Sequence, residues 1–336
     1  MFQRIGAAIA GVVFWVGAAW AGCVGQNLFD AMPGADQARL EAMAAAHPFH
    51  EGLLWTATRD DQQITLVGTL HYADPRFAPM LDALAPALDG ATALLVEAGP
   101  EEEAQLRVDM AKLMFSEGAT LPERLPEAEW QALGAAMEAR GFPRFMASKM
   151  QPWFVSLMLA IPLCELAEMQ AGQQGLDKQL IDVAHTQDLP LLALEPYDTI
   201  FGIFADMTPA EELLALRLAL GQAAEAEDMA ITMTDLYFAG RTSLIWELAL
   251  ERSRATAPPE LPPAELEAQI AESEKLMVTD RNTRWIPVIE GAAANGPIVV
   301  AAGALHMPGE HGVLALLQAR GWRIASYQPA NDAAVQ

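Results

Sequence analysis

The chain is poor in cysteine and in basic residues. Its 336 residues include two cysteines, and 20 lysines and arginines stand against 44 aspartates and glutamates, a formal net charge of −24. Such a polyanion repels nucleic acid and anionic lipid headgroups, which excludes nucleic acid as a partner. The sequence also lacks a Gly-x-Ser-x-Gly elbow, a Walker loop and a His-Glu-x-x-His motif. The enzyme classes that depend on those motifs are therefore not indicated.

Apolar runs long enough to cross a membrane are absent except at the N-terminus. Arg4 is the only charge in the first 25 residues, and an uncharged run extends from Ile5 to Gly25. Ala19-Trp20-Ala21 has the small-x-small pattern that signal peptidase cleaves after. The sequence therefore predicts a signal peptide over residues 1–21 and an exported protein, periplasmic in a bacterium.

Two other interpretations of this segment remain open. Ala21-Gly22-Cys23 resembles the end of a lipoprotein signal, although Trp20 occupies the position where that signal prefers leucine. An uncut run of about 20 residues would be long enough to anchor the chain in a bilayer. All three interpretations place the folded part outside the cytoplasm, and the membrane is a partner only through such a lipid or uncut anchor.

The two cysteines, Cys23 and Cys164, favour one disulfide if the chain is exported. That bridge would tie the mature N-terminus to the body of the protein. The alternative is a pair of free thiols, with Cys164 buried in the apolar run Phe154–Leu166. The bridge also requires that Cys23 carries no lipid.

Short apolar runs alternate with amphipathic segments, which is typical of an α/β fold. Leu53–Thr58 and Gln63–Gly68 predict a β-hairpin, followed by a helix over Arg76–Leu88 and a buried strand over Ala91–Val96. Strand, helix and strand in this order predict a parallel pair with a crossover. Further buried strands, and one closing strand, are predicted over Leu189–Leu194, Ile298–Ala302 and Trp322–Tyr327.

Two long segments are dominated by helical patterns. Residues 101–175 predict a helical insertion, with a buried helix over Phe154–Leu166, and residues about 206–291 predict a second helical region. Thr208-Pro209-Ala210-Glu211 has the pattern of a capping box at a helix start. We therefore expect residues 22–336 to form one α/β domain. Its central sheet is mixed but largely parallel and comes from two pseudo-repeated halves, with the helical insertion as a cap.

The same motif ends two predicted strands that lie far apart in the chain. The apolar run before Gly68-Thr69-Leu70-His71 and the run before Gly303-Ala304-Leu305-His306 both finish in Gly-x-x-His. Gly68 and Gly303 leave no Cβ in the way of a tight turn. Because ligands of parallel sheets lie beyond the carboxyl ends of the strands, the two motifs predict one shared site.

Carboxylates also follow two predicted strands. Glu97 closes one and Glu195 another, and an ionised Glu97 after an apolar strand needs a cation or strong donors. Two imidazoles with one or two carboxylates suit an open divalent-metal site whose bound water attacks a carbonyl. A glutamate acting as general base is an alternative. The structural alternatives are a satisfied histidine and, for Glu195, an ion pair.

Arg281 and Asn282 lie on the predicted helix before the last buried strand. If both side chains were exposed to solvent, neither would indicate a function. They could instead donate hydrogen bonds to an anionic intermediate or orient a glutamate.

These motifs, in this order, resemble the TraB/GumN family, which is related to the TIKI metalloproteases. The resemblance covers roughly residues 53–328. The matching elements are Leu66–His71, Leu94–Glu97, Gly175-Leu176-Asp177 with Leu191–Glu195, and Arg281-Asn282 followed by Ala302–Glu310. One departure is Leu305, where many relatives have glycine.

The resemblance implies an α/β fold like that of the erythromycin-esterase-like proteins. It also implies a metal at His71, Glu97 and His306, with Mn²⁺ or Co²⁺ the ions associated with peptide hydrolysis in the TIKI branch; Zn²⁺ is not excluded. By the same match Arg281 and Asn282 become site residues beside Glu97. The leading prediction is therefore an exported, metal-dependent hydrolase of a peptide or another small molecule with an amide bond. The rivals are a non-catalytic envelope protein that binds metal, haem or a glycan during polysaccharide production, and an esterase.

Overall fold

A six-stranded mixed sheet forms the centre of the protein, in the order β4-β3-β5-β2-β1-β6. The computed structural model describes residues 23–199, 202, 207–259 and 261–329, so the predicted signal peptide lies outside the described residues. The strands are β1 (Leu54–Arg59), β2 (Gln62–Thr69), β3 (Ala93–Val96), β4 (Leu191–Ala193), β5 (Ile298–Gly303) and β6 (Arg323–Ser326). The predicted α/β class with a mostly parallel sheet is confirmed.

The predicted hairpin is present, and its turn has a clear local cause. β1 and β2 pair in antiparallel fashion and are joined by only two residues, of which Asp60 has a positive φ of 52°. Two-residue hairpin loops need positive φ, and aspartate tolerates it better than most residues.

The predicted direct pairing of the second and third strands is wrong. β2 and β3 run parallel, but β5 lies between them and pairs with both. Five of the six residues of β5 are buried, because both of its faces are covered. A strand with two apolar faces is most stable in the middle of a sheet. β5, the last buried strand in the sequence, therefore lies between β2 and β3.

The predicted strand Leu189–Leu194 is shorter and less buried than expected. It is reduced to β4, which pairs only with β3 at the edge of the sheet, and Leu192 is 41% exposed. An edge strand has one neighbour, so its apolar residues need not all face the core.

Helices cover both faces of the sheet. Residues alternate along β5, so that Val299 and Ala301 join one buried cluster while Val300 and Ala302 join the other. α2 (Phe77–Asp89) and α9 (Leu176–Thr186) contribute to the first cluster, with α12 (Ala226–Phe238) and α13 (Thr242–Ala255). α15 (Asp280–Ala293) and α16 (Val313–Ala319) contribute to the second.

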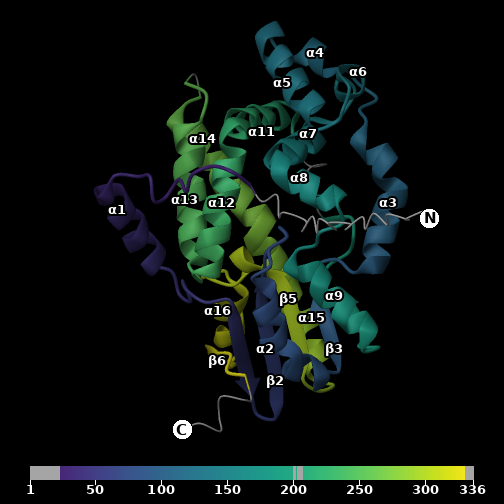
Figure 1. Ribbon diagram of the computed structural model, residues 1–336, viewed down its shortest axis with the longest axis vertical. Coiled ribbons are helices and arrows are strands. Elements are labelled where there is room, and N and C mark those ends of the chain that lie inside the picture. The colour runs from purple at the N-terminus through teal and green to yellow at the C-terminus, as the bar shows by residue number, and fades with distance from the viewer. Residues whose placement is uncertain (1–22, 200–201, 203–206, 260, 330–336) are drawn as a thin grey trace, which may run out of the picture.

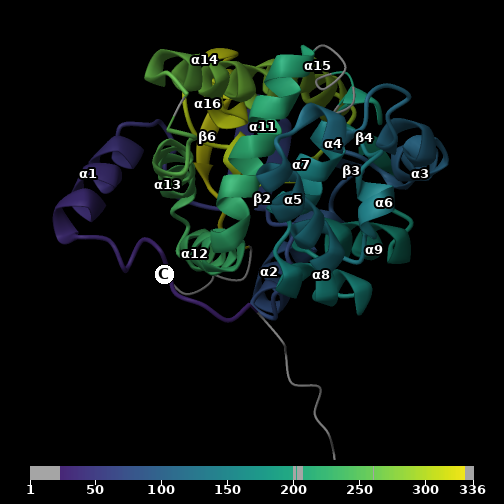
Figure 2. The same ribbon diagram turned by 90° about the horizontal axis from the view of Figure 1, so that it is seen from above.

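Most helices of the two helical segments predicted from the sequence lie beyond the carboxyl ends of the parallel strands, whereas α15 of the second segment packs on a face of the sheet (Figure 1). Seen from above, α12 to α14 form one group and α3 to α8 another around the end of the sheet, with α11 between them against α7 (Figure 2). The first segment contains α3 (Pro100–Met114), α4 (Leu121–Arg124), α5 (Glu127–Ala139), α6 (Arg144–Ala147), α7 (Pro152–Ala160) and α8 (Leu163–Gln170). The second contains α11 (Pro209–Gln222), η1 (Ala223–Glu225), α12, α13, α14 (Pro263–Glu274), the π-helical turn η2 (Lys275–Thr279) and α15. The capping box predicted at Thr208 is present at the start of α11.

The single helix predicted over Phe154–Leu166 is wrong. α7 and α8 meet at an angle of 89° instead. Pro162 cannot continue a helix and forces the preceding Ile161 into an extended conformation, with φ −81° and ψ 120°. Within the described residues no single helix meets the length and hydropathy of a membrane span, and this bent pair meets them only when its two helices are taken together.

A disulfide joins Cys23 to Cys164, with a Cα–Cα distance of 5.1 Å. It places the start of the described chain beside α8. Gln26 N then donates to Asp228 Oδ1 at 2.8 Å, and Leu28 N donates to Thr232 Oγ1 at 2.7 Å. From there the chain continues to α1 (Gly34–Ala45), which packs along α13. Covalent and hydrogen bonds thus attach the N-terminal segment to both helical groups.

Glu165 lies against this disulfide, with Oε1 3.6 Å from Cys23 Sγ. Burial, together with the charges of Glu168 and Asp74, raises the pKa of Glu165 to about 7. Between pH 4.5 and 7 the unfolded chain loses a proton that the folded chain keeps, so stability falls as pH rises through this window. Allowing for screening by water, Glu165→Gln is expected to stabilise the fold by about 2 kcal/mol at pH 8 and not at pH 4.

Urea unfolding of the Glu165→Gln variant and the unmodified protein at pH 4 and pH 8 checks this. Glu51→Gln, in an exposed position, serves as control and should change stability at neither pH. An equal effect of Glu165→Gln at both pH values would contradict the prediction.

Candidate active site

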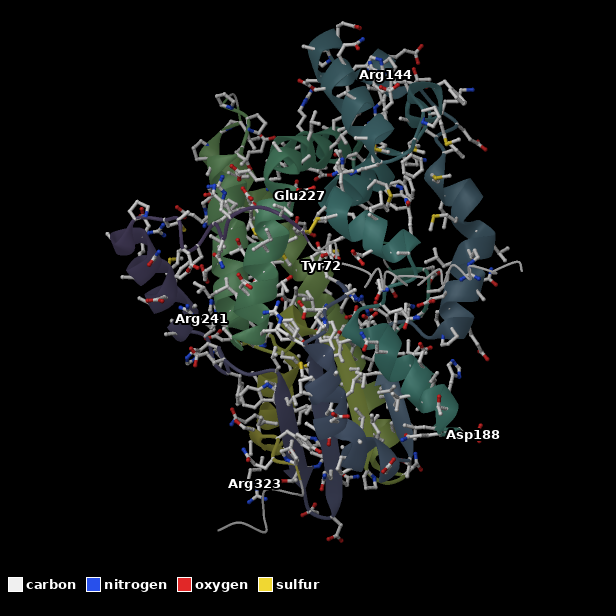
Figure 3. All side chains as sticks on the ribbon, viewed as in Figure 1. Tyr72, Arg144, Asp188, Glu227, Arg241 and Arg323 are labelled. Atoms are coloured by element: carbon white, nitrogen blue, oxygen red, sulfur yellow. A yellow bond between two sulfur atoms is a disulfide. The ribbon has the colours of Figure 1, made fainter. Side chains whose placement is uncertain are left out.

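Polar side chains from four strands gather at the carboxyl edge of the sheet. Glu97 follows β3 directly, Glu195 comes two residues after β4, and His306 ends the short 3₁₀ turn η3 (Ala304–His306) after β5. His71 comes two residues after β2, whose Gly68 and Thr69 pair with Ala302 and Gly303 of β5. Tyr72, the next residue, is labelled in Figure 3, where it lies between the sheet and the helical groups.

Arg281, near the start of α15, lies at the centre of this group. Its side chain is 6% exposed, and its Nη2 donates to Glu97 Oε2 at 2.5 Å and to Glu195 Oε1 at 2.6 Å. Nε donates to both oxygens of Glu195 at 3.0 and 3.1 Å. The π-helical turn η2 immediately precedes α15, and the carbonyl of Met277 in that turn accepts from Nη1 at 3.3 Å. Such turns are frequent where a helix presents a functional side chain.

Asn282 determines which nitrogen of His306 carries the proton. Asn282 Nδ2 donates to the carbonyls of His306 and His311, at 3.2 and 2.9 Å, so Oδ1 must accept from His306 Nδ1 at 2.7 Å. His306 Nε2 is then unprotonated and accepts from Arg281 Nη1 at 3.2 Å. Burial lowers the pKa of His306 to about 4, and the indole of Trp285 packs against its ring at 4.5 Å between centroids.

Glu97 is ionised within the cluster. Burial by itself would raise the pKa of Glu97, but the electrostatic influence of His306 and Arg281 reverses this effect and lowers it to about 2. Gly303 N donates to Glu97 Oε1 at 2.7 Å, which also favours the charged form. The carboxylate is therefore held by one backbone donor and one guanidinium.

His71 has a different environment from its counterpart. Its side chain is 67% exposed, and Nδ1 lies 3.2 Å from Asp177 Oδ2. The hydrogen bond to Asp177 raises the pKa of His71 to about 9, although water on the exposed face screens part of this effect. Leu176 N donates to Leu70 O at 3.0 Å, and a Cβ at Gly175 would collide with the backbone of His71. The start of α9 can approach His71 this closely only because residue 175 is glycine.

The two Gly-x-x-His motifs therefore present histidines of opposite character at one edge of the sheet. His71 is exposed and favours the protonated form, whereas His306 is buried and neutral. Paired groups whose pKa values are driven apart are typical of an acid and a base in one site.

The glycines of the two motifs provide close approach. Gly303 has a φ of −48°, and neither glycine is among the residues with positive φ. A Cβ at Gly68 would lie 3.1 Å from the Cα of Ala304, and one at Gly303 would lie 3.3 Å from Glu97 Oε1. The two turns therefore use glycine because a Cβ at either position would crowd its neighbours, and not because the backbone has a positive φ. Tyr237 also donates to Gly68 O at 2.7 Å, which holds the end of β2.

Sequence reasoning missed two participants. Asp177 appeared only as part of a matching motif, without a role, and Trp285 was not singled out. Trp285 donates from Nε1 to Glu195 Oε2 at 3.0 Å, in addition to packing on His306. Its position four residues after Arg281, on the same face of α15, was the available signal.

The geometry does not gather a metal-ligand set. In the part of the chain that the structure describes, no three histidine, cysteine, aspartate or glutamate side chains come together as a metal site. Glu97 and His306 are linked through Arg281, whose guanidinium takes the place that a cation between them would occupy. His71 and His306 both bind a partner through Nδ1, as metal-ligating histidines do, so the donor types alone would suit a metal.

Comparison with known proteins adds the family. The profile of the TraB/PrgY/gumN family matches residues 53–326, which include every residue of this cluster. The chain belongs to the TraB/PrgY/gumN family. Its curated relatives in this family include the uncharacterized protein YbaP of Escherichia coli (strain K12), 27% identical over 251 residues that cover 73% of this chain and 84% of YbaP. YbaP of Shigella flexneri matches to the same extent. The family resemblance predicted from the sequence is confirmed.

Proposed function

We propose that this protein is an exported hydrolase that cleaves a peptide or amide bond at the carboxyl edge of its sheet. The observation that carries the proposal is the pair of histidines with opposite pKa shifts at one edge of the sheet, of which His306 contacts the buried Arg281. A general acid, a general base and a fixed positive charge each accelerate the hydrolysis of an amide.

Each group has a role that follows from its contacts. His306 offers an unprotonated Nε2 that can accept a proton from an attacking water once Arg281 Nη1 releases it. His71 offers a proton to the leaving amine, and Asp177 keeps its ring charged and oriented. Arg281 supplies positive charge near the carbonyl oxygen as it becomes an oxyanion. Glu97, ionised and fixed by Gly303, orients the guanidinium.

The predicted divalent metal does not fit the arrangement of these side chains, because Arg281 lies between the carboxylate and His306. None of these residue roles depends on a metal. Metal dependence, with Mn²⁺, Co²⁺ or Zn²⁺ on His71, Glu97 and His306, stays a prediction. Measuring bound metal in the purified protein, and turnover before and after chelation, tests it directly.

Export is part of the same proposal. The predicted signal peptide supports it, and so does the Cys23–Cys164 disulfide, because such bridges persist in oxidising compartments and are rare in the cytosol. A periplasmic or surface location follows, with a lipoprotein or an N-terminally anchored form as the alternatives. Fractionation of cells that express the full chain distinguishes them.

The test of hydrolysis uses the oxidised mature chain and a mixture of peptides, with products identified by mass spectrometry. His71→Gln and His306→Gln are each expected to lower the cleavage rate at least about a hundredfold, since each removes one side of the acid–base pair. His185→Gln, on the exposed part of α9, is the matched control and should cleave at the unmodified rate. Unchanged cleavage by both site variants would refute these roles. A protein that binds a metal, haem or a glycan and cleaves nothing would favour the binding-protein alternative.

A further inference from the structure

A cavity of about 360 Å³ lies next to the candidate site. Its walls come from the segment after α1, from α13, from the end of α14 and the π-helical turn η2, and from the segment between β5 and α16. Two wall residues connect it to the site. Leu305 is the neighbour of His306, and Val278 follows Met277, whose carbonyl binds Arg281. The backbone segments that carry His306 and Arg281 therefore form both the site and one side of the cavity.

The lining of the cavity is acidic. Glu274 and Glu310 line it, and among its described lining residues there is no lysine or arginine. The other titratable lining groups are the imidazoles of His47 and His311. The remaining described lining is mainly apolar, and it includes the indole ring of Trp246.

A third carboxylate lies behind this wall with an unsatisfied oxygen. Glu247 is 5% exposed, its Oε1 lies 2.7 Å from Nε2 of the lining residue His47, and its Oε2 has no hydrogen-bond partner among the residues that the structure describes. Glu247 lies four residues after the lining residue Ser243 on α13; it does not line the cavity itself and reaches the cavity wall through its contact with His47. A buried carboxylate oxygen without a donor is costly, and a cation in the cavity would offset that cost.

Trp246, on the same helix, adds a surface that suits a positive charge. The face of an indole attracts ammonium and guanidinium groups within about 6 Å. The cavity volume is near the lower end of the roughly 300–1,000 Å³ range of ligand pockets, which favours a single side chain over a large ligand. The net charge of −24 also steers cations toward the protein as a whole.

We propose that this cavity is a specificity pocket that receives a positively charged side chain, an ammonium or guanidinium group, of the substrate. The proposal rests on the proposed hydrolase function, because it assigns the cavity to a residue next to the bond that is cleaved. Glu274, Glu310 and Glu247 provide the negative charge, and Trp246 contacts the alkyl stem and the charged head.

Isothermal titration calorimetry of the oxidised mature protein at low ionic strength tests the pocket without any need for cleavage. The probes are the Nα-acetyl methylamides of lysine, norleucine and glutamate. The lysine probe is expected to bind at least about tenfold more tightly than the norleucine probe, which has the same stem without the charge, and the glutamate probe should not bind. Glu274→Gln and Glu310→Gln should each weaken lysine binding several-fold. Glu272→Gln, an exposed acid on the same helix as Glu274, is the control and should not.

Equal binding of the lysine and norleucine probes, or no binding of the lysine probe up to its solubility limit, overturns the pocket. Cleavage of peptides then gives a separate readout. Selective lysine binding without any cleavage would support the pocket and refute the hydrolase function. Cleavage without preference for lysine or arginine, together with no selective binding, would refute the pocket and support the hydrolase function.

Discussion

Arg281→Met is expected to lower the free energy of unfolding by about 3–5 kcal/mol. The side chains of Arg281 and Glu195 are each 6% exposed, and the guanidinium also binds Glu97. Methionine preserves much of the volume but leaves Glu195 as a buried charge whose largest compensating partner is gone. Removing one member of a buried ion pair typically costs this amount, since the remaining charge keeps its desolvation penalty. Urea unfolding at pH 7 measures the loss.

Two further variants show whether the unpaired charge of Glu195 causes the loss of stability. Arg281→Met combined with Glu195→Gln should recover about 1–3 kcal/mol relative to the single variant, because the neutral amide no longer needs the arginine. Arg284→Met, three residues along α15 and exposed, should change stability by less than about 0.5 kcal/mol. A single variant as stable as the unmodified protein would show that water reaches Glu195 and that the pair is not buried in solution.

Much of this cluster was predictable because it depends on one rule about sheets. Glu97, Glu195 and His306 each follow a strongly apolar run, and parallel strands present their carboxyl ends at one edge. That rule is independent of strand order. The error in placing β2 beside β3 therefore did not affect the site, although β5 lies between them.

The roles inside the cluster were less predictable. Whether Glu195 binds a metal or an arginine depends on how far α15 extends toward the sheet, and that distance is set by packing between segments 86 residues apart. The difference between His71 and His306 has the same origin. Identical spacing in the two motifs carries no information on which histidine the helix α15 will bury and which will remain exposed beside Asp177.

In the helical part the local signals in the sequence are strong, but in one run two of them conflict. The capping box at Thr208 is encoded in four consecutive residues, and it forms as predicted. The run Phe154–Leu166 also contains its own break at Pro162. Uniform hydrophobicity suggested one helix, whereas the restriction that proline places on Ile161 was the more decisive signal.

Loss of the Cys23–Cys164 bridge is expected to destabilise the protein by about 3–5 kcal/mol. The bridge joins residues 141 positions apart, and loop-closure entropy for a loop of that length corresponds to about 5 kcal/mol at 25 °C, while measured bridges more often contribute about 2–4. The stabilisation arises mainly because the oxidised unfolded chain has fewer conformations available. The expected measurement is a lower urea midpoint for the Cys23→Ser/Cys164→Ser double variant than for the oxidised protein.

Reduction of the unmodified chain provides the matched comparison, since it breaks the same bond without changing the side-chain volume much. The reduced protein and the double variant should unfold at the same urea concentration. Asp228→Ala, which removes only the acceptor of the Gln26 N–H, should cost about 1 kcal/mol and so separates the contribution of the hydrogen bond from that of the covalent link. If the double variant and the oxidised protein have the same midpoint, the N-terminal segment contributes nothing to global stability. In that case the N-terminal segment detaches before the rest of the protein unfolds, and the bridge serves only as a local attachment. It then does not restrict the unfolded chain relative to the partly opened state from which the chain unfolds.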